Sequence, residues 1–381
     1  MPPIDNVPLL DLRREPELDL ALEEAFRRVL RSGHYILGPE VDALEAECAS
    51  YLGVSHALGV SSGTDAILLA LMALGIGPGD EVLCPTYTFF ATAGTIWRLG
   101  ARPIFVDIDP VTYNCDVRAL AGRITSRTRA IMPVHLFGQA ADLDPILALA
   151  ADRGLAVVED AAQALGSEYK GRRVGGHGAF GCFSFFPSKN LGALGDAGLL
   201  TTNDAALAER ARILRTHGGK PKYHHQVVGG NFRIDALQAA LLRVKLPRLD
   251  GYTAARQRNA ALYDELLLAS GQAARGAGDR PVLLPAVVAS RHIYNQYVIR
   301  LPEPGHRDRL RAFLKDRGVG TEVYYPVPMH EQACFAELGH RLGDFPHAEA
   351  AARQTLALPI FPELRQDEIR HVVGSVLAFF A

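Results

Sequence analysis

Short apolar segments alternate with longer amphipathic stretches over the first two-thirds of the chain. In the longer stretches apolar residues recur every three or four positions, which is the period of a helix with one buried face. Strands separated by helix-length segments predict a mostly parallel sheet with crossover helices. The predicted strands of this seven-stranded sheet are 56–60, 81–84, 102–106, 128–134, 155–159, 180–186 and 197–202.

The pattern changes near Leu246-Pro247, where a second unit begins. The segment 271–285 is rich in Gly, Ala, Arg and Pro and predicts a loop, whereas 321–325 predicts a strand. We therefore expect a large domain with an N-terminal helical segment over 1–246, and a smaller α+β domain over 247–381. The fold class is α/β.

Composition narrows the possible functions. The formal net charge of the 381 residues is -2, which gives no electrostatic reason to expect a nucleic-acid or membrane partner. The five cysteines lack the CxxC spacing of a zinc site or the pattern of a disulfide framework, and no metal is expected. The N-terminus is too charged for a signal peptide, and the longest apolar run is too short to span a bilayer. We expect a cytoplasmic protein.

Two segments suggest a specific chemistry. Asp160 comes at the end of the predicted strand 155–159, and the next predicted strand, 180–186, carries Ser184 and is followed by Lys189. A lysine amine can hold an aldehyde cofactor as a Schiff base, an aspartate can keep a pyridine nitrogen protonated, and a serine can bind a phosphate. Each residue alone has an ordinary alternative, such as a surface charge or a helix cap. Their order along the chain predicts a pyridoxal phosphate site.

Further segments add candidate anion sites. The run 61–65, Ser-Ser-Gly-Thr-Asp, opens a predicted helix, where backbone N–H groups can bind phosphate, although a plain helix cap needs only one of these residues. Asp235 and Gln238 have capping-box spacing, and the loop before them carries Asn231 and Arg233 as possible anion ligands. The basic and aromatic run 220–225 includes Lys222 and His224 and could face a diphosphate. The GxGxxG at 176–181 precedes a strand and does not predict a dinucleotide site.

The whole chain resembles the DegT/DnrJ/EryC1/StrS nucleotide-sugar aminotransferases, which have the aspartate-aminotransferase fold, fold type I of the pyridoxal phosphate enzymes. The matching stretches occur in the order typical of the family. They are 32–39, 62–66, 85–89, 159–163, 184–189, 230–233 and 324–326.

The resemblance implies a set of cofactor contacts. Lys189 would bind pyridoxal 5'-phosphate covalently and then carry the proton, and Asp160 would pair with the ring nitrogen. The other contacts would be Gln163 on the phenolic oxygen, Phe89 stacked on the ring, Gly63, Thr64 and Ser184 on the phosphate, and Asn231 of the partner subunit on that same phosphate.

The resemblance also implies substrates and a homodimer with shared active sites. Arg233 would meet a carboxylate of the amino donor, L-glutamate, whose keto form is 2-oxoglutarate, and Tyr325 and His330 would line the sugar pocket. The acceptor would be a UDP- or dTDP-linked 3-oxo sugar, for amino-sugar biosynthesis. A 4-oxo sugar and a pyridoxal phosphate-binding regulatory protein are the alternatives, and sequence leaves the nucleotide, the sugar and the pathway open.

Overall fold

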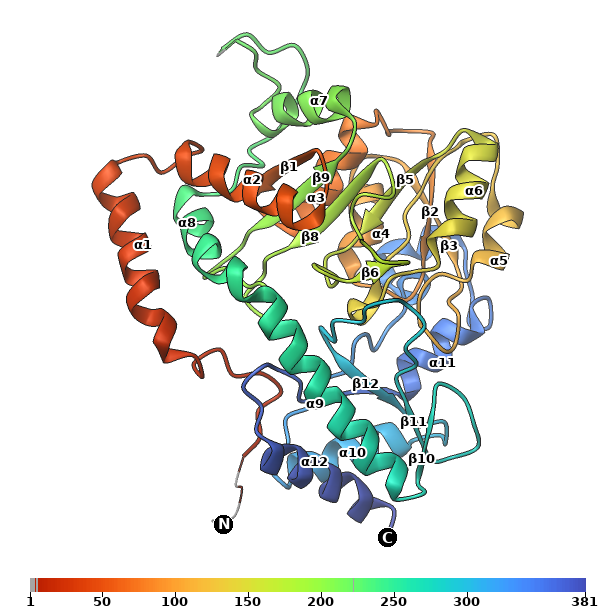
Figure 1. Ribbon diagram of the computed structural model, residues 1–381. Coiled ribbons are helices and arrows are strands. Elements are labelled where there is room, and N and C mark those ends of the chain that lie inside the picture. Colours follow the sequence, from red (N-terminus) through yellow and green to blue (C-terminus); the bar gives the residue numbers. More distant parts are fainter. Residues whose placement is uncertain (1–3, 5, 222) are drawn as a thin grey trace.

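The computed structural model describes residue 4 and residues 6–221 and 223–381. A seven-stranded sheet forms its centre, in the order β1-β9-β8-β5-β4-β2-β3 (Figure 1). β9 pairs antiparallel with β1 and β8, and the other neighbours are parallel, which confirms the predicted sheet. The strands are β1 (His56–Val60), β2 (Glu81–Pro85), β3 (Arg102–Val106), β4 (Thr128–Ile131), β5 (Ala156–Asp160), β8 (Phe180–Ser184) and β9 (Gly198–Thr202).

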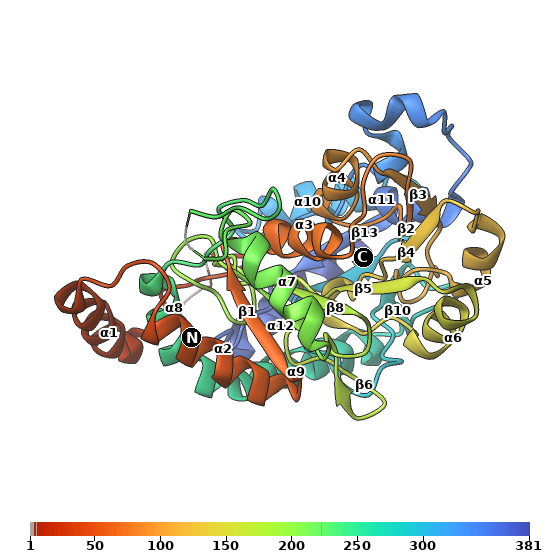
Figure 2. The ribbon, with the colours of Figure 1, turned by 90° about the horizontal axis from the view of Figure 1, so that it is seen from above.

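Helices cover both faces of this sheet, as Figure 2 shows from above. On one face, α3 (Gly63–Ala73), α4 (Phe90–Arg98) and α7 (Ala205–Arg215) share one buried apolar cluster. On the other face lie α2 (Pro39–Leu52), α6 (Leu143–Arg153) and α8 (Ala236–Lys245). Neighbouring side chains of β8 point to opposite faces of the sheet, because Cys182 belongs to the first apolar cluster and Phe183 to the cluster on the other face.

A four-stranded sheet, β10-β11-β12-β13, forms the smaller unit. Its helices and strands are α9 (Leu249–Ala269), β10 (Ala273–Arg275), β11 (Val282–Leu284), β12 (Tyr297–Arg300), α10 (His306–Lys315), α11 (Pro346–Gln354), β13 (Thr355–Leu358) and α12 (Gln366–Phe379). Val7 pairs with Val319 and is buried in the core of this unit, so the N-terminal segment packs with the C-terminal one. The division at residues 246 and 247 stays a prediction.

Two predictions about this unit were wrong. The segment 271–285 contains the parallel strands β10 and β11, because Ala273, Val282 and Leu284 are buried in the core. Gly276 and Gly278 lie in the connection between the two strands. The segment 321–325 forms only an isolated bridge, from Glu322 to Ala357. Its next backbone groups bond the hydroxyl of Tyr87 and do not pair with a strand.

The predicted capping box at the start of α8 is also wrong. Asp235 occupies the N-cap position, but its side chain makes no capping hydrogen bond. Gln238 bonds the backbone N–H and carbonyl of Leu194 and so fastens a distant loop to the helix.

Helix α1 (Asp19–Ser32) lies at the outer edge of the molecule in both ribbon views (Figures 1 and 2). Its Ala25 and Val29 are buried in the cluster that contains α8, but Leu20, Phe26 and Leu30 are exposed. An exposed apolar helix face of this kind is typical of an interaction surface.

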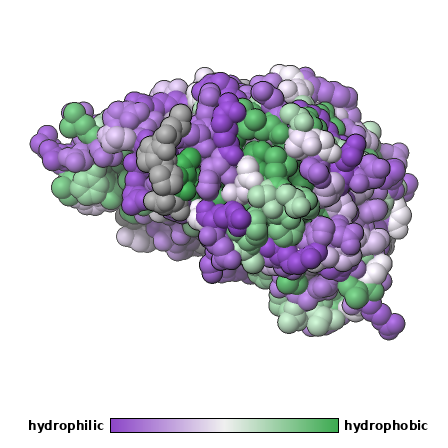
Figure 3. All heavy atoms as spheres, turned by 90° about the horizontal axis from the view of Figure 1, so that it is seen from below, coloured by the Kyte–Doolittle hydropathy of each residue, from purple (hydrophilic) through white to green (hydrophobic). Residues whose placement is uncertain are grey.

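The lower face of the molecule shows apolar patches separated by hydrophilic side chains (Figure 3). Within the described part of the chain, none of the helices combines the length and apolar character required to span a membrane.

Candidate active site

A cavity of about 400 Å³ lies beside the carboxyl end of β5, the N-terminus of α3 and the turn after β8. Ligand sites of open parallel sheets characteristically lie at the carboxyl ends of the strands. The predicted cofactor residues that line this cavity are Gly63, Thr64, Phe89, Asp160, Gln163, Ser184 and Lys189. The substrate prediction Tyr325 lines it as well.

The N-terminus of α3 forms one end of the cavity. Ser62 caps the helix by accepting a hydrogen bond from the N–H of Asp65 at 3.1 Å. Gly63 and Ser184 touch so closely that a Cβ built on Gly63 would lie 2.7 Å from the Cβ of Ser184. The glycine is therefore required for space. It lets a serine hydroxyl and the first N–H groups of a helix reach the same point, which is a suitable arrangement for a phosphate.

Two neighbouring carboxyls at the end of β5 have opposite electrostatic environments. Both Glu159 and Asp160 are buried. Burial alone would raise the pKa of Glu159, but its bonds to His135 and to backbone N–H groups bring that pKa below the usual range. Those N–H groups belong to Gly175, His177 and Gly178. The GxGxxG segment therefore binds a carboxylate of the chain itself, in agreement with our rejection of a dinucleotide site.

The charge of Asp160 is only partly balanced within the chain. Burial raises the pKa of Asp160, and two hydrogen-bond donors and the nearby Lys189 oppose this only in part. The Thr92 hydroxyl donates to Oδ2 at 2.7 Å, and the N–H of Ala162 donates to Oδ1 at 3.2 Å. A buried carboxylate with a raised pKa is stabilised by a cation placed against it. A protonated pyridine nitrogen is such a cation.

Lys189 lies on the turn that follows β8, where its N–H donates to the carbonyl of Phe186. Burial lowers the pKa of the Lys189 amine to about 8, although Asp160 opposes the shift. A substantial fraction of this amine is therefore neutral near physiological pH. Only the neutral amine can attack an aldehyde, so the site activates its nucleophile.

Gln163 and Tyr325 form another part of the cavity wall. The N–H of Phe137 donates to Oε1 of Gln163 at 2.7 Å, and Nε2 of Gln163 donates to the Tyr325 hydroxyl at 3.0 Å. The Tyr325 hydroxyl therefore keeps its own hydrogen for another acceptor. Tyr87 fixes this tyrosine from behind, because its hydroxyl accepts from the N–H of Tyr325 and bonds the carbonyl of Tyr324.

Other predicted residues lie away from this cavity. Asn231 and His224 are exposed, and neither they nor Arg233 line the cavity of their own chain. The loop that carries His224 projects beyond α7 in Figure 1. Nε of Arg233 is buried and has no hydrogen-bond partner within the described residues. Lys222 lies outside those residues.

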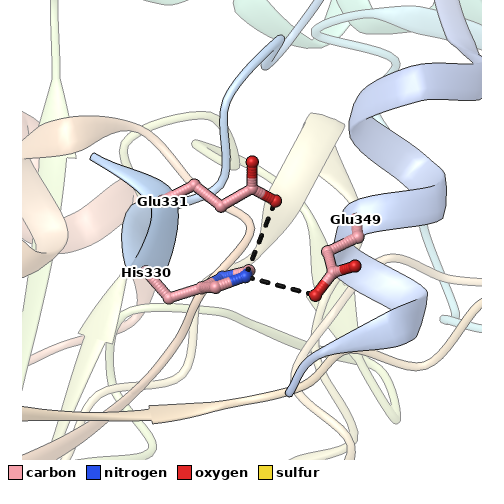
Figure 4. A group of neighbouring side chains, drawn as sticks. All are labelled: His330, Glu331 and Glu349. Atoms are coloured by element: carbon pink, nitrogen blue, oxygen red, sulfur yellow. Dashed lines mark ion pairs between the residues drawn. The ribbon is translucent and has the colours of Figure 1, made fainter. Parts of the chain in front are cut away.

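His330 lies in the protein interior. Its side chain is 0% exposed, and its Nδ1 lies 2.8 Å from the hydroxyl of Thr86. The ring points between two carboxylates, with Nε2 3.4 Å from Glu349 and 3.7 Å from Glu331 (Figure 4). His330 is not among the residues that line the cavity of this chain, and its role in a sugar pocket stays a prediction. If Thr86 donates to Nδ1, Nε2 carries the hydrogen, which favours an interaction with Glu349 over a metal ligand.

The side chains around the cavity fit pyridoxal phosphate. The helix N-terminus with Ser184 matches the phosphate, the only partly balanced Asp160 matches the ring nitrogen, and the activated Lys189 matches the aldehyde. Thr88 and Thr92, whose hydroxyls connect the cavity to Asp160, were not predicted from the sequence. Their spacing of four residues, just before and within the first turn of α4, was the available signal.

Comparisons with known proteins agree with this site. Residues 16–377 match the DegT/DnrJ/EryC1/StrS aminotransferase family. The chain is 48% identical to a "Pleiotropic regulatory protein" of Geobacillus stearothermophilus, over 98% of this chain and 99% of the relative. It is 44% identical to a UDP-N-acetyl-3-dehydro-alpha-D-glucosamine 3-aminotransferase of Acidithiobacillus ferrooxidans, over 97% of each chain. A crystal structure of S. venezuelae DesV superposes with a TM-score of 0.92 at 42% identity, covering 98% of each chain. The chain belongs to the DegT/DnrJ/EryC1/StrS aminotransferase family.

Proposed function

We propose that this protein is a pyridoxal phosphate-dependent aminotransferase that moves the amino group of L-glutamate to the keto group of a nucleotide sugar. The observation that carries the proposal is the presence of an activated Lys189 and an only partly balanced Asp160 in one cavity, beside a helix N-terminus suited to phosphate. A protein that only bound a sugar would not need this combination.

Bound pyridoxal phosphate supplies the electron sink that transamination requires. Asp160 would stabilise positive charge at the ring nitrogen. Lys189 would hold the cofactor through its amine, and its Nζ would also serve as general base and acid, a role that suits a pKa of about 8. Tyr325 offers its free hydroxyl hydrogen to an oxygen in the cavity.

The acceptor is proposed to be a 3-oxo sugar linked to UDP or dTDP. Support comes from the Acidithiobacillus ferrooxidans relative, which is named a 3-aminotransferase and is 44% identical to this chain. The 4-oxo sugar is the alternative. For the diphosphate, Lys222 and His224 stay candidates as part of the basic run 220–225.

We further propose that the active protein is a homodimer with shared sites. Asn231 and Arg233 do not line the cavity of their own chain. Asn231 pairs with Thr216 at the base of the loop that carries His224, which is available to reach a second subunit. Around the cavity, Phe89 and Phe186 are 55% and 52% exposed. Large apolar side chains with this exposure at a cavity mouth suit burial by a partner.

One assay tests the function. The purified protein is incubated with 2-oxoglutarate and a panel of amino nucleotide sugars that carry the amine on C3 or C4, and glutamate formation is measured. We expect glutamate only with the C3 amines. The name of the Geobacillus stearothermophilus relative makes a regulatory protein the second candidate. Cofactor binding without glutamate formation from any sugar of the panel would favour that candidate.

A further inference from the structure

A chain of hydroxyl groups leads from the cavity to Asp160. Thr88 lines the cavity, and its Oγ1 lies 2.9 Å from Oγ1 of Thr92. Oγ1 of Thr92 in turn lies 2.7 Å from Oδ2 of Asp160. The three residues are 1%, 0% and 4% exposed, so bulk water does not compete for these bonds.

The direction of the bonds follows from the number of hydrogens. An ionised carboxylate only accepts, and each threonine has one hydroxyl hydrogen. Thr92 must therefore donate to Asp160, and Thr88 must donate to Thr92. A protonated Asp160 could still accept from Thr92, but a hydrogen bond to a neutral carboxyl is weaker than one to a carboxylate. The two hydroxyls therefore favour the ionised form of Asp160.

Helix α4 does not need the Thr92 hydroxyl for its own structure. Thr95, one turn further along, shows the ordinary behaviour of a buried helical threonine, because its hydroxyl donates to the carbonyl of Ala91 at 2.8 Å. Thr92 instead directs its hydroxyl across to β5. The two threonines have similar burial, at 0% and 2% exposed, and differ in the group to which their hydroxyls donate.

We propose that Thr92 is a positioning residue that keeps Asp160 ionised and oriented toward the cofactor's ring nitrogen, with Thr88 supporting it. Thr92 occupies Oδ2 from one side and Ala162 occupies Oδ1. Each carboxylate oxygen has two lone pairs, so one remains on each for a ring N–H. The proposal depends on pyridoxal phosphate as the cofactor and does not depend on which sugar is the substrate.

The test compares two ligands on the cofactor-free protein. Pyridoxal phosphate carries the ring nitrogen, and its deaza analogue has a carbon at that position and cannot become a ring cation. Dissociation constants of both are measured by equilibrium dialysis for wild-type protein, Thr92→Val and Thr92→Ser. Thr95→Val is the matched control, because it removes a buried hydroxyl from the same helix. Thr92→Ala repeats the test with a smaller side chain in case valine prevents folding.

Thr92→Val and Thr92→Ala should bind pyridoxal phosphate about 10- to 100-fold more weakly, the scale of one lost hydrogen bond to a charged group. Both should bind the deaza analogue as tightly as wild type or more tightly, since that ligand gains nothing from an ionised Asp160. Thr92→Ser and Thr95→Val should match wild type with both ligands. An equal loss for both ligands, or no loss of pyridoxal phosphate affinity, would overturn the proposal.

Discussion

The contact between Gly63 and Ser184 allows a quantitative test of the proposed phosphate site. In Gly63→Ala the new Cβ would lie 2.7 Å from the Cβ of Ser184 and 3.2 Å from its Cα. Atoms this close force a shift, and overpacking of this kind costs about 1–3 kcal/mol. We expect the shift to move the Ser184 hydroxyl and to weaken cofactor binding about 10-fold or more, because a hydrogen bond to a charged group is lost.

A second glycine provides the control. Gly251 lies in α9, and a Cβ built on it would meet nothing within 4 Å. Gly251→Ala should stabilise the protein by about 0.5–1 kcal/mol through helix propensity alone. Denaturant unfolding of both variants without cofactor, followed by titration with pyridoxal phosphate in the visible range, separates the clash from the propensity effect.

Substitutions of Ser184 identify which of its atoms clashes with the Cβ that Gly63→Ala introduces. Ser184→Gly removes the Cβ that Gly63→Ala would strike, whereas Ser184→Ala removes only the hydroxyl. In double-mutant cycles Gly63→Ala should couple to Ser184→Gly by about 0.5–3 kcal/mol, which is typical of contacting residues, and much less to Ser184→Ala. The reasoning about this contact would be refuted if Gly63→Ala behaved like Gly251→Ala. It would also be refuted if Ser184→Gly restored none of the stability lost in Gly63→Ala.

Further predictions concern the remaining site residues. Asp160→Asn should retain cofactor but reduce turnover about 10²-fold or more, and near-normal turnover would contradict its role. Because the pKa of Lys189 is about 8, the rate of covalent cofactor attachment to the cofactor-free protein should rise as pH increases toward 8 and level off above it; stopped-flow absorbance would reveal a flat profile if this is wrong. Mixing inactive Lys189→Ala subunits with inactive Asn231→Ala/Arg233→Ala subunits should restore activity, unless each site is built from one chain. Arg233→Ala alone should slow the glutamate half-reaction more than the sugar half-reaction, which single-turnover kinetics would separate.

The sequence predicted the cavity because local segments determine most of it. Asp160 and Ser184 end two strands of one sheet and Lys189 lies on the turn after the second, and the carboxyl ends of parallel strands meet at one edge. Lys189 and Gly63 therefore lie in the same cavity although they are distant in the chain. Strand and turn patterns at each segment were sufficient for this part of the prediction.

The parts of the structure that were not predicted from the sequence depend on contacts between residues far apart in the chain. The Tyr324-Tyr325 segment has an apolar, strand-like pattern, but the Tyr87 hydroxyl takes its backbone groups. Nothing near either segment indicates this pairing. His330 likewise follows the tyrosines closely in sequence, yet its bond to Thr86 directs it into the protein interior. The partners of a buried polar group are set by tertiary packing, which a pattern along the chain does not contain.

The strands β10 and β11 show a different limit of predicting structure from sequence. Glycine, alanine and arginine are poor strand signals, and a short strand obtains its stability from the core it covers. Ala273 and Val282 are buried against the small-unit core, and that burial outweighs the local preference of the segment for a loop.

The most direct test of the central claim follows nitrogen from donor to product. The protein is incubated with ¹⁵N-labelled L-glutamate and a UDP- or dTDP-linked 3-oxo sugar, and the product is examined by NMR, with Lys189→Ala as the inactive control. The account predicts ¹⁵N bonded to C3 of the sugar with wild-type protein and no transfer with the variant. Transfer that persists in Lys189→Ala, or no transfer to any 3-oxo or 4-oxo nucleotide sugar by cofactor-loaded wild-type protein, would contradict it.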